Sequence, residues 1–348
     1  MFTLVPLASI ELAADLVWLR GLNFTHFMVI VVFYLLWRLP GPPKESASDI
    51  VWYDAVECLP PVESDDSEDD AVPFEDEAFL SARVKESTAA ERLRFFVAKG
   101  RDRVKAVQAL RVYTDWRIQH ELALDPARPS SAFLSARSRL HKNEIAATEV
   151  ATDKQIWDEV SLIALKVRKE QNCHHPLPQI AYLHQNTGKD ICDKAGKRIL
   201  HFIPGQMDDR IASTVTYALA VALYVNRLMD RDSTELVTVV IDTRGGHGWR
   251  NLNAAQLLPF IQHLSKLMLT MFPQRLYRAL VFPIPSRFFW VWRMARNCID
   301  VDTREKICPL MGPSTIDSEP PMEQIAEYLG RENAVLLEAK RKASFLSE

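Results

Sequence analysis

The residues best placed for chemistry follow a run of six apolar or β-branched residues at 236–241. Asp242 ends this run, and a Gly-Gly-His-Gly turn at 245–248 comes three residues later. An aspartate or histidine at such a place could act as a general base, and a glycine-rich turn could cradle a phosphate. However, the turn lacks the lysine and the serine or threonine of a phosphate-binding loop, His247 has no evident catalytic partner, and no GxSxG motif occurs. We therefore expect Asp242 to close or cap a strand, the glycines to form a left-handed turn, and the protein not to be an enzyme.

A second candidate for chemistry is the run Cys173-His174-His175. These residue types can bind metals, but three adjacent side chains in regular structure cannot all point at one ion, and no fourth ligand is suggested nearby. The cysteines of the chain are odd in number and form no CxxC pair (Cys58, Cys173, Cys192, Cys298 and Cys308). We therefore predict no metal site, no other cofactor and no disulfide framework, which favours a reducing compartment.

Length and charge limit the remaining functions. A chain of 348 residues allows about two domains, and 48% hydrophobic residues with 25% charged residues is the composition of a globular protein. The net charge of -3 gives no electrostatic reason to expect a nucleic-acid partner.

The first 40 residues are apolar, and 22–39 is about the minimum length for a bilayer crossing. Arg20 and Arg38 flank this stretch, and Trp37 lies where interfacial aromatic residues are found. A signal peptide would need a basic start and a small-residue cleavage site, and an amphipathic surface helix would need a polar face. We predict a single-pass membrane anchor, with Arg38 and Lys44 favouring a cytosolic body.

An acidic linker follows at 41–72, with its charges concentrated in Glu-Ser-Asp-Asp-Ser-Glu-Asp-Asp at 63–70. Such a run repels itself and stays solvated, so we interpret it as a disordered spacer. A phosphorylated regulatory segment or a site for a basic partner remains the alternative.

Helical sequence fills the next part of the chain. Apolar residues recur at i, i+3, i+4, i+7 and i+10, which predicts one buried stripe (Ala106, Ala109, Leu110, Tyr113 and Trp116). We assign residues 73–140 to a helical lobe, 141–174 to a helical connector, and 331–348 to a C-terminal helical tail.

Between the connector and the tail, 175–330 reads as an α/β domain. Apolar strands are expected at 199–203, 236–242 and 279–282, and they alternate with amphipathic helices at about 211–226 and 253–271. Because the run at 236–241 is almost uninterrupted, its strand should be covered by helices on both faces of the sheet. Asn253 followed by Gln256 predicts a capping box at the start of the second helix.

Short motifs in this region and in the helical lobe have a fixed order and spacing. They are Leu93-Arg94-Phe95-Phe96-x-Ala98-Lys99, Trp116-Arg117, Asp193-Lys194-Ala195-Gly196-Lys197-Arg198, Phe272-Pro273-Gln274-Arg275-Leu276, Val281-Phe282-Pro283-Ile284-Pro285 with Phe288, Trp292, and Asp302-Thr303-Arg304-Glu305-Lys306-Ile307. Over about residues 75–330 this set resembles the CRAL-TRIO family of lipid-binding proteins, which includes phosphatidylinositol transfer proteins and the α-tocopherol transfer protein. Pro283 departs from the family pattern, which has Asn there, and predicts a distorted strand end.

The resemblance implies a mixed β-sheet that floors an apolar cavity for one lipid, with a gate helix after the third strand. Here the gate maps to 286–296, and its predicted membrane contacts are Phe288, Phe289, Trp290, Trp292 and Arg293. Aromatic rings beside arginines suit a membrane interface, where rings insert and guanidinium groups meet phosphates. A core helix with a basic solvent face is the alternative.

The resemblance also implies a headgroup site. The family's phosphoinositide-binding positions fall on Lys99, Gln274, Thr303 and Lys306. Thr303 and Lys306 match the family, whereas Lys99 stands for an arginine and loses its planar fork, and Gln274 stands for a glutamate and loses its charge.

The sequence thus predicts non-enzymatic binding and exchange or presentation of a lipid at a membrane, with phosphatidylinositol or another phospholipid as the expected ligand. The alternative is a membrane-tethered interaction scaffold that has kept this fold without exchanging lipid.

Overall fold

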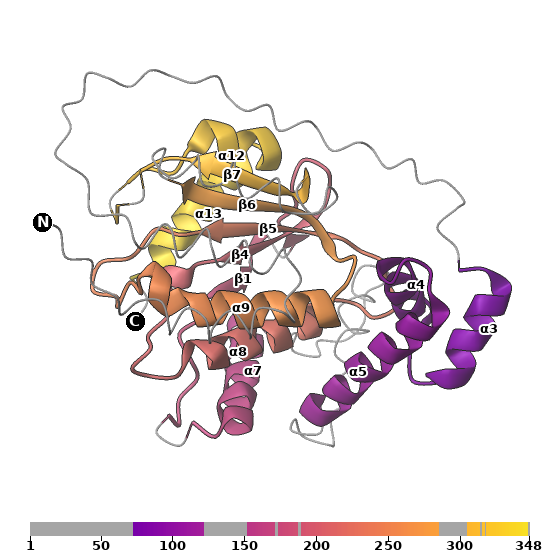
Figure 1. The fold of residues 1–348 in the computed structure, drawn as a ribbon. Coiled ribbons are helices and arrows are strands. Elements are labelled where there is room, and N and C mark those ends of the chain that lie inside the picture. The colour runs from indigo at the N-terminus through magenta and orange to yellow at the C-terminus, as the bar shows by residue number, and fades with distance from the viewer. Residues whose placement is uncertain are drawn as a thin grey trace, which may run out of the picture.

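The computed structural model describes residues 72–121, 152–170, 173–186, 189–284, 305–313, 315–316 and 318–346. At its centre lies a five-stranded sheet in the order β1-β4-β5-β6-β7 (Figure 1). β1 is antiparallel to β4, and the other neighbours are parallel. The strands are β1 (Ala181–Leu183), β4 (Arg198–Phe202), β5 (Val237–Asp242), β6 (Leu276–Ile284) and β7 (Ile307–Met311). The predicted α/β fold with a mixed sheet is confirmed.

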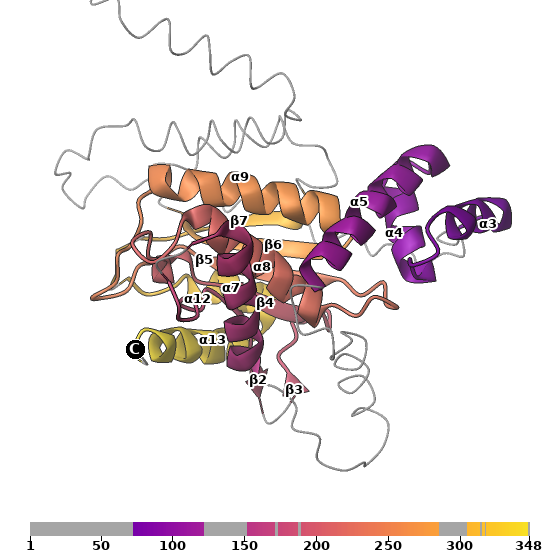
Figure 2. The same ribbon diagram turned by 90° about the horizontal axis from the view of Figure 1, so that it is seen from below.

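Helices cover both faces of the sheet, as expected for strands without polar alternation. On one side lie α7 (Asp153–Arg168), α8 (Thr214–Leu228) and α9 (Ala254–Met271), and on the other side lie α12 (Met322–Leu329) and α13 (Arg331–Ser344) (Figures 1 and 2). A small hairpin, β2 (Gln185–Asn186) with β3 (Lys189–Asp190), and a 3₁₀ turn at Pro204–Gln206 complete this part. The segment predicted as a helical tail is therefore helical and lies against the sheet.

The local signals account for most element boundaries. The capping box of Asn253 and Gln256 begins α9 as predicted, and the helix continues through Pro259. The preceding helix begins at Thr214, three residues later than expected. At the end of β6, the pairing with β7 changes register between Val281 and Ile284, which is the distortion that Pro283 predicts.

The helical lobe consists of α3 (Phe74–Arg83), α4 (Ala89–Ala98) and α5 (Arg103–Glu121). The predicted stripe of α5 packs inward, since Ala106, Leu110, Tyr113 and Trp116 are buried. α4 begins with a capping box in which Thr88 and Glu91 bond each other's backbone amides.

Some predictions lie outside the described residues. They are the anchor at 22–39, nearly all of the acidic linker at 41–72, and the gate at 286–296. The same holds for residues 122–151, where the predicted lobe meets the predicted connector. Within the part of the chain that the structure describes, no helix is long and apolar enough to cross a membrane.

Candidate functional site

One face of the sheet is closed. We call it the closed face, and its side chains on β5, β6 and β7 are Val240, Leu280, Phe282, Cys308 and Leu310, each at most 4% exposed. They form one apolar cluster with side chains from α12 and α13 (Ile325, Leu329, Ala334 and Leu337). This face is an ordinary core.

The alternating residues of the same strands point to the other face, which we call the open face. Strand pairing aligns Val239, Ala279 and Ile307 in one row and Ile241, Val281 and Pro309 in the next. All six are apolar, yet five are only half-buried, and Ala279 is 8% exposed. Val239 and Ile241 belong to the cluster that includes partly buried side chains of α9 (Leu257, Ile261, Leu264, Leu267 and Met268). An apolar surface left half-exposed between a sheet and a helix can take up an apolar ligand.

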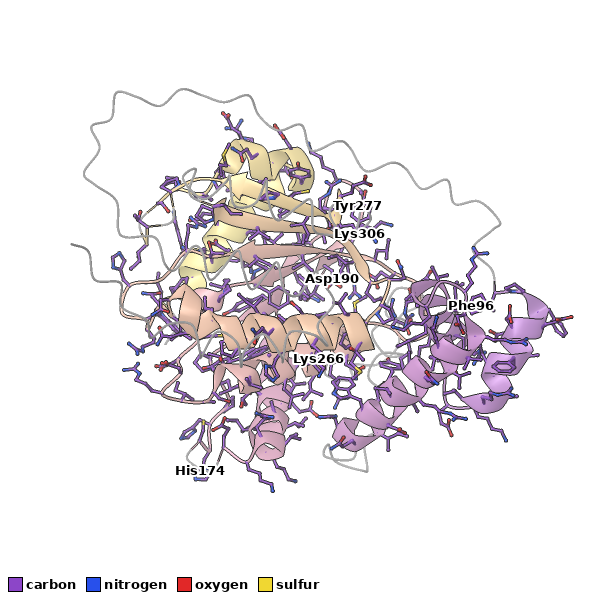
Figure 3. The ribbon with its side chains drawn as sticks, in the orientation of Figure 1. Phe96, His174, Asp190, Lys266, Tyr277 and Lys306 are labelled. Atoms are coloured by element: carbon purple, nitrogen blue, oxygen red, sulfur yellow. The ribbon has the colours of Figure 1, made fainter. Side chains whose placement is uncertain are left out.

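Cations gather at the end of the sheet where the parallel strands begin. By alternation Arg278 shares the direction of Leu280, and its guanidinium also lies 4.6 Å from the Tyr328 ring of α12 on the closed face. Lys306 directly precedes β7, and the pairing of Ile307 with Ala279 places it beside Arg278 of β6. The Tyr277 ring has the ammonium group of Lys197 5.6 Å and the guanidinium of Arg278 5.4 Å from its centre. Figure 3 shows Tyr277 and Lys306 at the same end of the sheet. Such a cluster can bind a phosphate group.

The predicted headgroup residues are placed unequally. Gln274 is exposed, lies just before β6 with φ 56°, and shares the edge with Lys306. Lys99 caps the end of α4 in the helical lobe. Thr303 and the gate residues Phe288, Phe289, Trp290, Trp292 and Arg293 lie outside the described residues. Within the described part of the chain, no hydrogen bond or ion pair joins Lys99, Gln274 and Lys306, so the headgroup site stays a prediction.

Two arginines of the family motifs have structural roles. Arg94 donates to the Ser233 carbonyl at 2.6 Å, which joins α4 to the loop before β5. Arg275 is buried and donates to the carbonyls of Asp230 and Glu235, and burial together with the nearby Arg94 charge lowers its pKa to about 10. Arg94 thus joins the lobe to the domain, and Arg275 fixes the loop before β5 to the start of β6.

A buried ion pair reinforces this junction. Glu91 is fully buried and accepts from Arg231 at 2.7 and 3.0 Å and from the Tyr113 hydroxyl at 3.1 Å. Burial raises the pKa of Glu91, but the hydrogen bond and charge of Arg231, with Thr88 and Arg117, bring it below its usual range. The carboxylate is therefore ionised in the folded protein.

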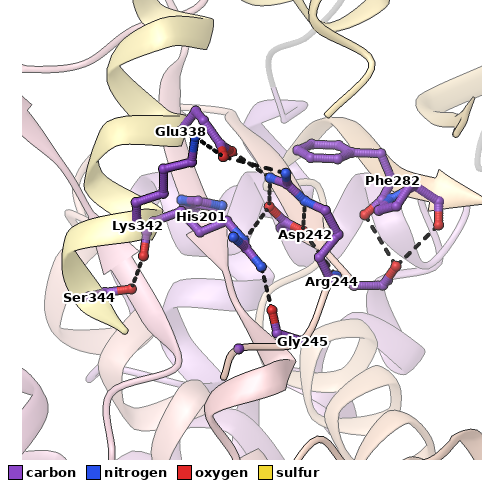
Figure 4. Close-up of polar contacts among 12 residues, drawn as sticks. His201, Asp242, Arg244, Gly245, Phe282, Glu338, Lys342 and Ser344 are labelled. Atoms are coloured by element: carbon purple, nitrogen blue, oxygen red, sulfur yellow. Dashed lines mark hydrogen bonds and ion pairs between the residues drawn. The ribbon is translucent and has the colours of Figure 1, made fainter. Parts of the chain in front are cut away.

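Asp242, the residue weighed first for chemistry, lies in a buried network behind the closed face (Figure 4). Arg244 donates to Asp242 at 3.0 and 2.6 Å and to Glu338 of α13 at 2.5 Å, and Arg341 Nε lies 3.1 Å from Asp242. The adjoining cavity, lined by His201 among others, holds only about 10 Å³, the room of one water molecule. Asp242 is thus a structural anion at the strand end, as the sequence favoured.

No metal arrangement accompanies these sites. Within the described residues, no group of three His, Cys, Asp or Glu side chains could hold an ion. The Cys173 thiol contacts the His175 carbonyl at 3.1 Å, and His174 and His175 are exposed.

Comparison with known protein families decides what this architecture belongs to. Residues 185–330 match the family model for the CRAL/TRIO domain. The chain contains a CRAL/TRIO domain. The match covers β2 to α12, including every strand that forms the open face, whereas the helical lobe, α7 and α13 lie outside it. CRAL/TRIO domains bind lipids and other lipophilic molecules, so lipid binding is the general function that this assignment supports.

Other comparisons add little. The crystal structure of Sfh5 is similar to this chain with 15% identity over 72% of this chain and 68% of that chain, at a TM-score of 0.38. The search of curated proteins gives no match.

Proposed function

We propose that this protein binds one lipid on the open face of its CRAL/TRIO domain and exchanges or presents it at a membrane without covalent chemistry. The observation that carries the proposal is the difference in burial between alternating residues of β5 to β7. Leu280 is fully buried, whereas the adjacent Val281, equally apolar, is only half-buried. A protein gains nothing from an exposed apolar sheet face unless something apolar covers it.

The acyl chain of a lipid would cover this half-exposed apolar surface. Burial of each CH₂ group contributes roughly 0.8 kcal/mol, so a chain of about ten buried CH₂ groups offsets the loss of freedom on binding. The open face and α9 supply apolar walls on two sides. The predicted gate with Phe288, Phe289, Trp290, Trp292 and Arg293 would supply the third wall and the membrane contact.

The cations at the strand edge support a phosphate-bearing headgroup. Lys197 and Arg278 lie close to the Tyr277 ring, and Lys306 and Gln274 lie at the same end of the sheet. Thr303 would join Lys306, and Lys99 would approach from the helical lobe. We therefore propose phosphatidylinositol or another phospholipid as the ligand.

The N-terminal segment sets the place of exchange. With an anchor at 22–39, the domain would remain at one membrane, so presentation or exchange over a short distance is proposed rather than long-range transport. The acidic residues at 63–70 would hold the domain away from an anionic bilayer surface.

Lipid extraction from the purified full-length protein tests this function against the scaffold alternative. We expect about one lipid per chain, identified by mass spectrometry after organic extraction. A scaffold would carry no stoichiometric lipid under the same conditions. Detergent controls without protein distinguish bound from carried-over lipid.

A further inference from the structure

The last turn of α13 inserts an aromatic side chain into a socket made by two glycines. A Cβ atom on Gly246 would lie 2.1 Å from the Phe345 ring, and one on Gly205 would lie 2.8 Å from the Arg244 carbonyl and 3.5 Å from the same ring. The Trp249 ring meets Phe345 edge-on at 5.6 Å, and the Arg341 guanidinium lies 4.9 Å from the ring centre. Neither Gly205 nor Gly246 has a positive φ, so close approach rather than a left-handed turn requires glycine here.

Polar contacts fix α13 to the same loop. Arg341 donates to the Gly245 carbonyl at 2.6 Å, and Gln206 donates to the Ser344 carbonyl at 3.0 Å (Figure 4 shows the first). Glu338, one turn earlier in α13, accepts from Arg244. The end of α13 is thus bonded twice to the residues that follow β5 and once to the 3₁₀ turn that follows β4.

This loop reaches both boundaries of the open face. Toward α9, the Asn251 side chain accepts from the Gly246 amide at 2.9 Å and donates to its carbonyl at 2.8 Å, two residues before Asn253 caps the helix. Toward β6, the Thr243 amide donates to the Phe282 carbonyl at 2.8 Å and its hydroxyl to the Pro283 carbonyl at 3.2 Å. β6 ends one residue later and runs directly into residues 285–304.

We propose that Phe345 is a positioning residue that latches the loop at 243–252 and thereby sets how readily lipid enters and leaves the open face. When the ring sits in the glycine socket, the loop holds the start of α9 and the end of β6 at a fixed separation. When the ring leaves, both boundaries of the open face gain freedom through the loop. The control of lipid exchange rests on the proposed function, whereas the contacts between Phe345 and the loop do not depend on it.

The full-length chain with Phe345→Ala tests the latch, and Leu346→Ala is the matched control because Leu346 is 86% exposed. We expect hydrogen exchange in 243–256 to quicken by about tenfold or more in Phe345→Ala, while α12 and β5 keep their protection. Exchange of a fluorescent phospholipid with vesicles should quicken in the same variant. Leu346→Ala should match the wild type in both measurements.

A second pair of variants distinguishes a latch from a general loss of packing. Gly246→Ala should expel the ring and reproduce the effects of Phe345→Ala. The double variant with both substitutions should be no worse than Phe345→Ala alone, because the methyl group then meets no ring. Additive effects of the two substitutions would contradict the socket.

The outcomes separate the latch from the proposed function. If loop protection is unchanged in Phe345→Ala, the latch is overturned. If the loop opens but lipid exchange keeps its wild-type rate, its control of exchange is overturned. If the wild type takes up no lipid, the proposed function fails, and with it the control of exchange.

Discussion

The two faces of the central sheet are made by the same strands and the same kind of residue, yet they differ in what covers them. On the closed face, α12 and α13 bury Val240, Leu280 and Leu310 to 4% exposure or less. On the open face, Val239 and Val281 remain half-buried. The apolar sequence of a strand therefore does not by itself distinguish a protein core from a ligand-binding surface. The helices that cover each face of the sheet make that distinction.

Charged side chains differ between the two ends of the sheet. The closed face is backed by the buried network of Asp242, Arg244, Glu338 and Arg341, which fixes one side of the sheet. The cations Lys197, Arg278 and Lys306 lie at the opposite end of the sheet, where the parallel strands begin. The buried network therefore fixes the end of the sheet where the parallel strands finish, whereas the cations lie at the end where they start.

The largest effect should come from breaking the network behind the closed face. Asp242→Ala leaves Arg244 and Arg341 buried with Glu338 as the remaining carboxylate, and unfolding by urea should show a loss of about 3–5 kcal/mol. The control Asp209→Ala removes a partly exposed partner of Arg250 and should cost under about 1 kcal/mol. Equal losses in the two variants would contradict the division between the faces.

The next largest effect should come from acid, which lowers the free energy of unfolding through two buried histidines. Burial and the neighbouring Arg341 and Arg244 lower the pKa of His201 to about 3, and burial with the neighbouring His201 and Lys340 lowers the pKa of His184 to about 2. Both are neutral in the folded state, whereas in the unfolded state each takes up a proton near pH 6.5.

Stability should therefore fall as the pH drops below about 6.5, by up to about 1.4 kcal/mol per pH unit for each histidine. Urea unfolding at pH 7 and pH 5 measures the loss. The double variant with His184→Gln and His201→Gln should lose most of this dependence of the unfolding free energy on pH. His263→Gln, at an exposed position of α9, should leave the dependence unchanged. If the wild type has the same free energy of unfolding at the two pH values, the lowered pKa values of the two histidines are contradicted.

A smaller effect should separate two adjacent valines of β5. Val240→Ala, on the closed face, should cost about 2–3 kcal/mol in unfolding free energy, whereas Val239→Ala, on the open face, should cost about 1 kcal/mol. Lipid occupancy should respond in the opposite order. If Val240→Ala lowers occupancy more than Val239→Ala does in protein that remains folded, the open face is not the ligand surface.

The smallest effect on stability should come from the headgroup site. Lys306→Ala should change the unfolding free energy by less than about 0.5 kcal/mol, since its side chain is only half-buried. Combined with Thr303→Ala, it should abolish transfer of phosphatidylinositol between vesicles. Lys266→Ala, on an exposed position of α9, is the matched control, and unchanged transfer in the double variant would remove the headgroup assignment.

Local patterns in the sequence predicted much of the fold. The β-branched run ended by Asp242 became β5, the stripe of α5 became its buried side, and the box of Asn253 and Gln256 became the start of α9. Such features depend on residues within one or two turns of each other. The order of the family motifs then supplied the assignment of the domain.

Contacts between distant segments could not be predicted in this way. Arg244 and Glu338 lie 94 residues apart, and no sequence pattern around either residue predicts the other as its partner. The glycines at 245–248 were expected to form a left-handed turn, and Gly248 does so with φ 81°. At Gly246 the ring of Phe345, about a hundred residues later, is instead the reason for glycine. Likewise, Lys197, Tyr277 and Arg278 were not singled out, because only the strand order brings them to the edge beside Lys306.

Photocrosslinking of a bound lipid tests the central claim most directly. The full-length protein would be loaded with a phospholipid that carries a diazirine in its acyl chain, irradiated, and mapped by peptide mass spectrometry. Labels should fall on Val239, Ile241, Val281, Ile307 and Pro309, and not on Val240, Leu280 or Leu310. Labels on the closed face, or none on the sheet at all, would contradict the account.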